Sequence, residues 1–106
     1  MPPLRGEVYW VTFAEPVGRR PVVVVQNDIG NRFSPTTIVA AVSSAPRRPY
    51  PFLVPLDASE LGRPSWVHCE ALNTIPSEVL EERLATLSSA AMDAVDEALR
   101  HSLELG

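Results

Sequence analysis

The sequence has a single cysteine, Cys69, and no long apolar run. One cysteine excludes an internal disulfide and a zinc site built from several cysteines. A membrane-spanning helix needs about 20 consecutive apolar residues, and eleven prolines divide this chain into much shorter apolar segments. Residues 1–5 also lack the apolar core of a signal peptide. We therefore expect a soluble, cytoplasmic protein without a membrane partner, folded as one domain over residues 1–106.

Lysine is absent too, so all nine basic residues are arginine. Thirteen acidic residues give a formal net charge of −4 at pH 7. The charge is unevenly spread, because residues 1–75 carry a net charge of +1 and residues 76–106 a net charge of −5. This balance gives no support to broad electrostatic binding of nucleic acid. Any such binding must come from a local arginine surface in the first three quarters of the chain.

Several motifs of metal, phosphate and nucleophile chemistry are missing. His68 and Cys69 are adjacent and would face opposite sides of a strand, and no HxxxH, CxxC or acidic cluster has ligand spacing. The glycines form neither GxGxxG nor GxxxxGK. No GxSxG motif supports a serine–histidine–acid triad, although the composition leaves a triad open. We expect no metal site and no cofactor.

Short apolar segments between the prolines predict a mainly β fold. The expected strands are residues 6–13, 22–25, 36–43, 52–56 and 66–69. The run 22–25 is wholly apolar, which is typical of a strand covered on both faces. Pro55 confines its strand to an edge or an end of the sheet. Residues 26–35 have room for one short helical turn, and residues 83–87 fit either a strand or a helix.

The C-terminal segment predicts an amphipathic helix. Its apolar stripe consists of Met92, Val95, Leu99 and Leu103. Ser88 or Ser89 is the expected N-cap, and Asp93, Asp96 and Glu97 fall on the solvated face. Five or six short strands followed by one helix predict a small half-open β-barrel capped by that helix.

Arginines and a serine form the strongest candidate site. Arg19 and Arg20 are expected in a short loop before a buried strand, Ser43 ends the adjacent strand, and two more arginines follow at 47 and 48. A fixed arginine presents a planar fork to a phosphodiester and stabilises a developing phosphorane. A serine hydroxyl donates to the same oxygens. Spacing alone leaves the alternative that the arginines form a solvated turn and the serine satisfies the backbone.

Two segments are distinctive, namely RGEVYWV at residues 5–11 and RPVVVVQNDIGNRFSPT at residues 20–36. Both closely resemble the MazF/PemK family of toxin endoribonucleases, as do residues 38–42 and the helix around 93–99. The resemblance covers nearly the whole chain. It implies a homodimer with an SH3-like half-open barrel of the CcdB/Kid/MazF type. It also implies metal-independent, sequence-specific cleavage of single-stranded RNA (mRNA), which leaves 2′,3′-cyclic phosphate and 5′-hydroxyl ends.

The resemblance further implies roles for individual residues. The family's catalytic arginine falls on Arg20, and its catalytic threonine falls on Ser43. Glu70 falls on an acidic position that contacts a base in some members and is a proposed general base in others, and Asn27 falls on an RNA contact. Because arginine almost never loses its proton, Glu70, or with less support His68, is better suited to accept the 2′-proton. Further expected RNA contacts are Arg19, Arg48, Tyr50 and His68.

The family also implies a partner, a MazE-like antitoxin whose disordered acidic tail covers the arginine-lined groove. Contact with DNA is expected only indirectly, through the antitoxin complex. The chain departs from the family pattern in a shorter loop between its first two strands. It also has Ala71 and Asn73 where a glutamine and an arginine are common.

Two other functions fit the same sequence. One is a gyrase-binding toxin of the CcdB type, which shares the fold but has no catalytic site. The other is a non-catalytic RNA-binding module. The pair of Arg20 and Ser43 favours the nuclease. The C-terminal residues 103–106 lack the Trp-Gly-Ile ending of the gyrase poisons.

Overall fold

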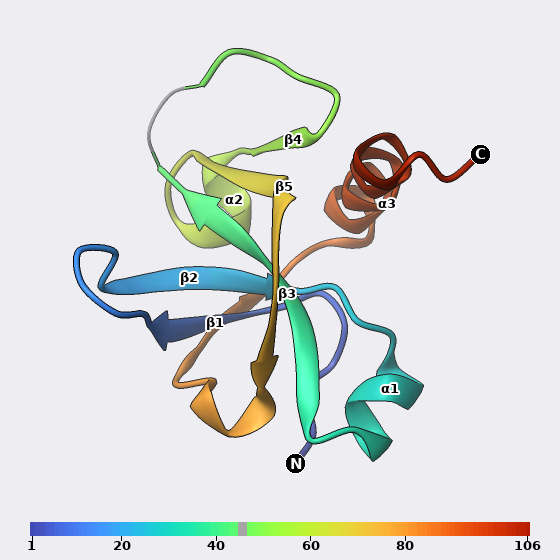
Figure 1. Ribbon diagram of the computed structural model, residues 1–106. Coiled ribbons are helices and arrows are strands. Elements are labelled where there is room, and N and C mark those ends of the chain that lie inside the picture. Colours follow the sequence, from blue (N-terminus) through green and yellow to red (C-terminus); the bar gives the residue numbers. More distant parts are fainter. Residues whose placement is uncertain (45–46) are drawn as a thin grey trace.

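The computed structural model describes residues 1–44 and 47–106, and within these ranges it forms a six-stranded antiparallel sheet (Figure 1). The strands are β1 (Glu7–Thr12), β2 (Arg19–Val24), β3 (Thr36–Ser43), β4 (Leu53–Leu56), β5 (Ser65–Pro76) and β6 (Arg83–Thr86). The helices are α1 (Asp28–Phe33), α2 (Ala58–Leu61) and α3 (Ser89–Leu103), with a 3-10 turn at Ser77–Val79. The order β4-β5-β3-β2-β1-β6 curls into a half-barrel, which confirms the expected mainly β fold with a C-terminal helix.

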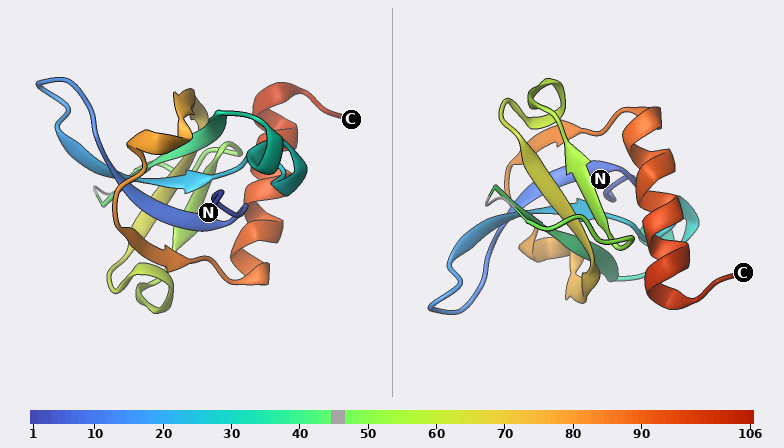
Figure 2. Two further views of the ribbon diagram at one scale, coloured as in Figure 1. Left: turned by 90° about the horizontal axis from the view of Figure 1, so that it is seen from below. Right: turned by 90° about the horizontal axis from the view of Figure 1, so that it is seen from above.

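The start of β2 corrects one expectation from the sequence. Arg19 and Arg20 are strand residues rather than loop residues, since they pair with Thr12 and Val11 of β1. Gly18 turns the chain just before them with a φ of 71°, a conformation that favours glycine. The hairpin of β1 and β2 projects beyond the rest of the sheet (Figure 2). Both arginines are therefore held by backbone pairing.

Other elements are longer or more definite than expected. β5 continues to Pro76, well beyond residues 66–69, because residues 72–76 pair with β3 after a register shift. Residues 83–86 form a strand that pairs with β1. A short helix, α2, occupies the expected polar turn, with Asp57 as its N-cap and Gly62 as its C-cap. β4 lies at an edge of the sheet, as Pro55 predicted.

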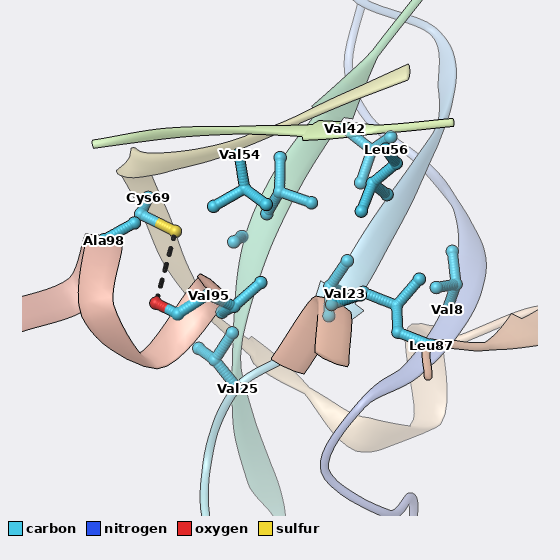
Figure 3. Close-up of a cluster of buried hydrophobic side chains, with 13 residues drawn as sticks. Val8, Val23, Val25, Val42, Val54, Leu56, Cys69, Leu87, Val95 and Ala98 are labelled. Atoms are coloured by element: carbon cyan, nitrogen blue, oxygen red, sulfur yellow. Dashed lines mark hydrogen bonds between the residues drawn. The ribbon is translucent and has the colours of Figure 1, made fainter. Parts of the chain in front are cut away.

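The sheet is buried on both faces. On one face, Val23 packs in a cluster with Val95 and Ala98 of α3 (Figure 3). On the other face, Val22 and Val24 pack in a second cluster with Val11 and Val39, which curled strands enclose. The double coverage expected for residues 22–25 is thus confirmed, and α3 lies on the face opposite to Val22.

The N-cap of α3 is Ser88, one of the two expected residues, whose Oγ accepts the N–H of Ala91 at 3.1 Å. Glu60 of α2 in turn accepts hydrogen bonds from the N–H and the hydroxyl of Ser88. Leu103 is 51% exposed, because the last turn of α3 runs beyond the core. Within the described ranges, no helix has the length and apolar character needed to cross a membrane.

Candidate functional site

An open depression of about 700 Å³ lies beside the start of β2 and the end of β3. It is lined by four arginines, Arg19, Arg20, Arg47 and Arg63. It is also lined by three serines, Ser43, Ser44 and Ser65. None of the described residues that line it is acidic. Guanidinium forks and hydroxyls without a competing carboxylate suit the oxygens of a phosphate group.

The sheet brings Arg20 and Ser43 to the same place. Val22 of β2 lies opposite Ala41 of β3. This is the last recorded pair of the two strands, and Arg20 and Ser43 each lie two residues beyond it, on the same face by strand alternation. Both residues line the depression. The guanidinium and the hydroxyl that the sequence singled out therefore face one common depression.

Arg19 is held by acidic and aromatic neighbours. Its Nε donates to Glu81 at 2.9 Å, its Nη2 lies 3.9 Å from Glu82, and its guanidinium lies 4.6 Å from the ring centre of Trp10. Hydrogen bonds from the hydroxyl of Thr12 and then from Arg19 lower the pKa of Glu81. These contacts fix Arg19 at the rim and offset its positive charge.

Arg20 has no such partner. Among the described residues, no ion pair includes Arg20. Its guanidinium donates to the backbone carbonyl of Arg19 at 3.2 Å. The positive charge of Arg20 is thus uncompensated beside Ser43 and remains available to an anionic ligand.

Ser43, His68 and Glu70 form a chain of side-chain contacts. Ser43 Oγ lies 2.7 Å from His68 Nε2, and His68 Nδ1 lies 3.4 Å from Glu70 Oε2. The side chains of His68 and Glu70 are 12% and 44% exposed, so the imidazole is the more enclosed of the two. The structure therefore joins three of the residues that the sequence analysis named separately.

The other expected RNA contacts lie outside this cluster. Asn27 caps α1, where its side-chain oxygen accepts the N–H of Gly30 at 2.7 Å. It follows the far end of β2, about 20 Å from Arg20 for an extended strand. Arg48 and Tyr50 are exposed between β3 and β4, and the ring of Tyr50 stacks on Phe52 at 5.2 Å.

Sequence reasoning missed two features of the site. Arg63 entered the sequence analysis only in the net charge, yet it lines the depression. It follows α2, a short helix where the sequence predicted only a polar turn. The bond between Ser43 and His68 depends on the register of β3 with β5, and no local motif encodes that register. Strand alternation alone could have put His68 and Glu70 on one face. Within the described residues, no group of three histidine, cysteine or acidic side chains is arranged to hold a metal ion.

Comparisons with known proteins agree on one family. The family described as PemK-like, MazF-like toxin of type II toxin–antitoxin system matches residues 4–103. The chain is 43% identical over 109 residues to endoribonuclease EndoA of Bacillus subtilis (strain 168), covering 95% of this chain and 94% of that protein. It is 38% identical over 109 residues to endoribonuclease MazF of Staphylococcus epidermidis, covering 95% of this chain and 91% of that protein.

Among solved structures, the chain is similar to an endoribonuclease in complex with its cognate antitoxin from a mycobacterial species. The TM-score is 0.88 at 26% identity, covering 98% of this chain and 97% of the other. The family match over residues 4–103 and the two relatives above 30% identity establish the relationship. The chain belongs to the PemK-like, MazF-like toxins of type II toxin–antitoxin systems.

Proposed function

We propose that this toxin is an endoribonuclease that cuts single-stranded RNA at short sequences without a metal ion, with the ribose 2′-hydroxyl as the nucleophile. The observation that carries the proposal is the unpaired charge of Arg20 beside Ser43 in a depression lined by four arginines. The names of the two curated relatives, both endoribonucleases, support the same activity. Its substrate, mRNA, implies a cytoplasmic site of action.

The reaction is an in-line displacement within the RNA. The 2′-oxygen attacks the adjacent phosphorus and the 5′-oxygen leaves, which yields a 2′,3′-cyclic phosphate and a 5′-hydroxyl. Arg20 binds the non-bridging oxygens and stabilises the charge that develops on them. Arginine stays protonated, so a different group must assist removal of the 2′-proton, and Glu70 is the carboxylate linked to Ser43 through His68. DNA lacks the nucleophile and is not cut.

The remaining arginines and the aromatic pair suit flanking nucleotides. Arg47 and Arg63 line the same depression and can hold neighbouring phosphates. Tyr50, 47% exposed and stacked on Phe52, offers a ring face to a base beyond the depression. Arg19 can bind a phosphate of the RNA only if that phosphate replaces its carboxylate partners. Arg48 and Asn27 are the more distant contacts in this proposal.

The natural inhibitor in this proposal is a MazE-like antitoxin with an acidic segment. Carboxylates of that segment would compete with RNA phosphates for the same arginines. The mycobacterial endoribonuclease of the same fold was solved with its cognate antitoxin, which supports a partner of this kind. Contact with DNA would then come from the antitoxin.

A homodimer is also proposed. Its support is the small core of a 106-residue chain together with exposed apolar residues such as Ile29 and Phe33, which are 75% and 77% exposed. Sedimentation at micromolar concentration should give twice the chain mass of 11.6 kDa. A monomer at that concentration would contradict the proposal.

The test of function is incubation with a long mixed-sequence RNA in EDTA, followed by mapping of fragment 5′ ends. Discrete cuts with 5′-hydroxyl ends are expected from the wild type and not from Arg20→Ala. RNA that is bound but intact in every context would favour the non-catalytic binding module. Intact and unbound RNA with inhibition of gyrase would favour the gyrase-binding toxin.

A further inference from the structure

A chain of side-chain contacts begins at the arginine-lined depression and ends at the exposed carboxylate of Glu70. Ser43 lines the depression, and its Oγ lies 2.7 Å from Nε2 of His68. The imidazole is largely enclosed, and its Nδ1 lies 3.4 Å from Oε2 of Glu70. The hydroxyl of Ser43 is thus presented to a ligand with an imidazole directly behind it.

Glu70 decides which ring nitrogen carries the hydrogen. A carboxylate accepts hydrogen bonds and cannot donate one. Nδ1 of His68 therefore carries the hydrogen, and Nε2 of the neutral ring is an acceptor. The hydroxyl of Ser43 then donates to Nε2, and its Oγ keeps lone pairs that can accept a hydrogen bond at the depression that Ser43 lines. In the free protein Ser43 is thus an acceptor, suited to the 2′-hydroxyl of an RNA rather than to a phosphate oxygen.

We propose that His68 receives the proton of the attacking 2′-hydroxyl by way of Ser43, an inference that rests on the proposed function. As the bond from O2′ to phosphorus forms and the bond from phosphorus to O5′ breaks, the 2′-proton moves to Ser43 Oγ. The original hydroxyl proton of Ser43 moves to His68 Nε2 in the same step. The 5′-oxygen takes a proton from water, and the imidazolium later returns its proton to water. Atoms and charge then balance.

This path divides the work among three residues. Ser43 touches the substrate and is a catalytic residue. His68 acts through Ser43 and is a positioning residue that also holds the proton. Glu70 orients the ring and stabilises the imidazolium, so its assistance is indirect. After the transfer, the new hydroxyl hydrogen of Ser43 can turn toward the phosphate oxygens that Arg20 binds.

Few other charged side chains lie on the strands next to the imidazole of His68. β5 supplies Glu70, and β3 supplies Ser43, which does not titrate in this range. On β4, Leu53 lies opposite His68, and the strand Leu53–Leu56 has no titratable residue. Arg20 lies one strand beyond β3 on the same face and is the cation of β2 to be considered, since its charge is uncompensated in the free protein.

The decisive experiment compares the pH profiles of kcat/KM for wild type and His68→Gln on an RNA that the wild type cuts. Histidine is the side chain whose ordinary pKa lies near neutral pH, so the wild-type rate should rise with unit slope through an acid limb. Glutamine can still bond to Ser43 but cannot accept a proton. The pH profile of the variant should have no acid limb. Its kcat should fall by at least about 100-fold, and its KM should change by less than about threefold.

His101→Gln is the matched control. His101 is the other histidine of the chain, exposed on α3 beside Glu97, and its variant should keep the wild-type profile. Glu70→Gln should cut more slowly yet keep the acid limb, because the imidazole is still present. Loss of the limb in Glu70→Gln would instead make Glu70 itself the base. A wild-type kcat, or a retained acid limb, in His68→Gln would overturn the inference.

A measurement on the wild type tests the proton path even if a variant fails to fold. The NMR titration of the His68 ring in the wild type should have the same midpoint as the acid limb of kcat/KM. Different midpoints would contradict the proton path even if every variant were unstable. A wild type that does not cut RNA would refute the proposed function, whereas a His68→Gln variant with the wild-type kcat would refute only the relay.

Discussion

Arg19 and Glu81 form an ion pair of 2.9 Å that ties the start of β2 to the segment before β6. The pair also lies beside Trp10, over which the guanidinium stacks. The next residue, Arg20, has no acidic partner among the described residues and lines the depression with Ser43. Two adjacent arginines of the same strand therefore have different surroundings, and we propose a structural role for the first and a chemical role for the second.

Replacing each of these arginines with alanine separates the two roles. Arg20→Ala should lower kcat for RNA cleavage by at least about 100-fold, because the developing charge on phosphorus loses its main cation. Arg19→Ala should cost less than about tenfold, since most of its charge is already offset by Glu81 and Glu82. Single-turnover cleavage of one fluorescent RNA measures both. Equal losses of kcat in the two variants would contradict the assignment of different roles to Arg19 and Arg20.

Substitutions at Ser43 test the hydroxyl. Ser43→Ala removes the group that links substrate to His68 and should lower kcat by about 100-fold. Ser43→Thr keeps the hydroxyl, and its added methyl restricts rotation about χ1. We expect the threonine variant to retain at least the wild-type rate. An alanine variant as active as the threonine variant would show that the hydroxyl is not used.

The stability of the β1–β6 edge depends on Glu7. This buried carboxylate accepts hydrogen bonds from the N–H of Leu4, the hydroxyl of Tyr9 and the guanidinium of Arg83, at 2.7, 2.8 and 2.9 Å. Burial by itself would raise the pKa of Glu7, but the three hydrogen bonds outweigh it and the pKa is lowered. Burial and the bond to Glu7 raise the pKa of Tyr9 to about 12.

Glu7→Gln should therefore lower the free energy of unfolding by about 2 kcal/mol near neutral pH. Because the folded-state pKa of Glu7 lies below the ordinary value of 4.5, its contribution is complete above that pH and is lost as the pH falls further. The difference in the free energy of unfolding between wild type and variant should therefore decrease as the pH falls below that value. Urea unfolding at several pH values measures it, with the exposed Glu78→Gln as control. A difference independent of pH would contradict the assignment.

Cys69 provides a probe of the core. Its side chain is fully buried and its Sγ lies 4.0 Å from the carbonyl oxygen of Val95 in α3 (Figure 3). Burial, together with the negative charge of Glu70, raises the pKa of the thiol to about 11. In the folded protein the thiol should react with Ellman's reagent at least about 100-fold more slowly than in urea. Rapid reaction without denaturant would contradict the packing of α3 on β5.

Much of the fold could be predicted from local patterns. The strand at residues 36–43 and the N-cap at Ser88 follow from residue type and spacing, and both are confirmed. The wholly apolar run 22–25 correctly predicted burial on two faces. The second half of β5 was not predictable in this way, because residues 72–76 lack a regular apolar–polar alternation and take their strand conformation from pairing with β3.

The site was only partly predictable, because its contacts are long-range. The partner that distinguishes Arg19 from Arg20 is Glu81, 62 residues from Arg19 along the chain. Ser43 and His68 are 25 residues apart and meet only through the register of two strands. Residue type and family resemblance named the groups, but the sheet determines which of them touch.

We propose that the depression lined by Arg20 and Ser43 cuts RNA with the RNA's own 2′-hydroxyl. Two synthetic oligonucleotides that differ only in a 2′-deoxy sugar at the mapped cleavage position, incubated with the wild type in EDTA, test this directly. The all-ribose strand should be cut to a 2′,3′-cyclic phosphate and a 5′-hydroxyl end. The deoxy-substituted strand should be bound and left intact. Cleavage of that strand at the same bond would show that the 2′-hydroxyl is not the nucleophile.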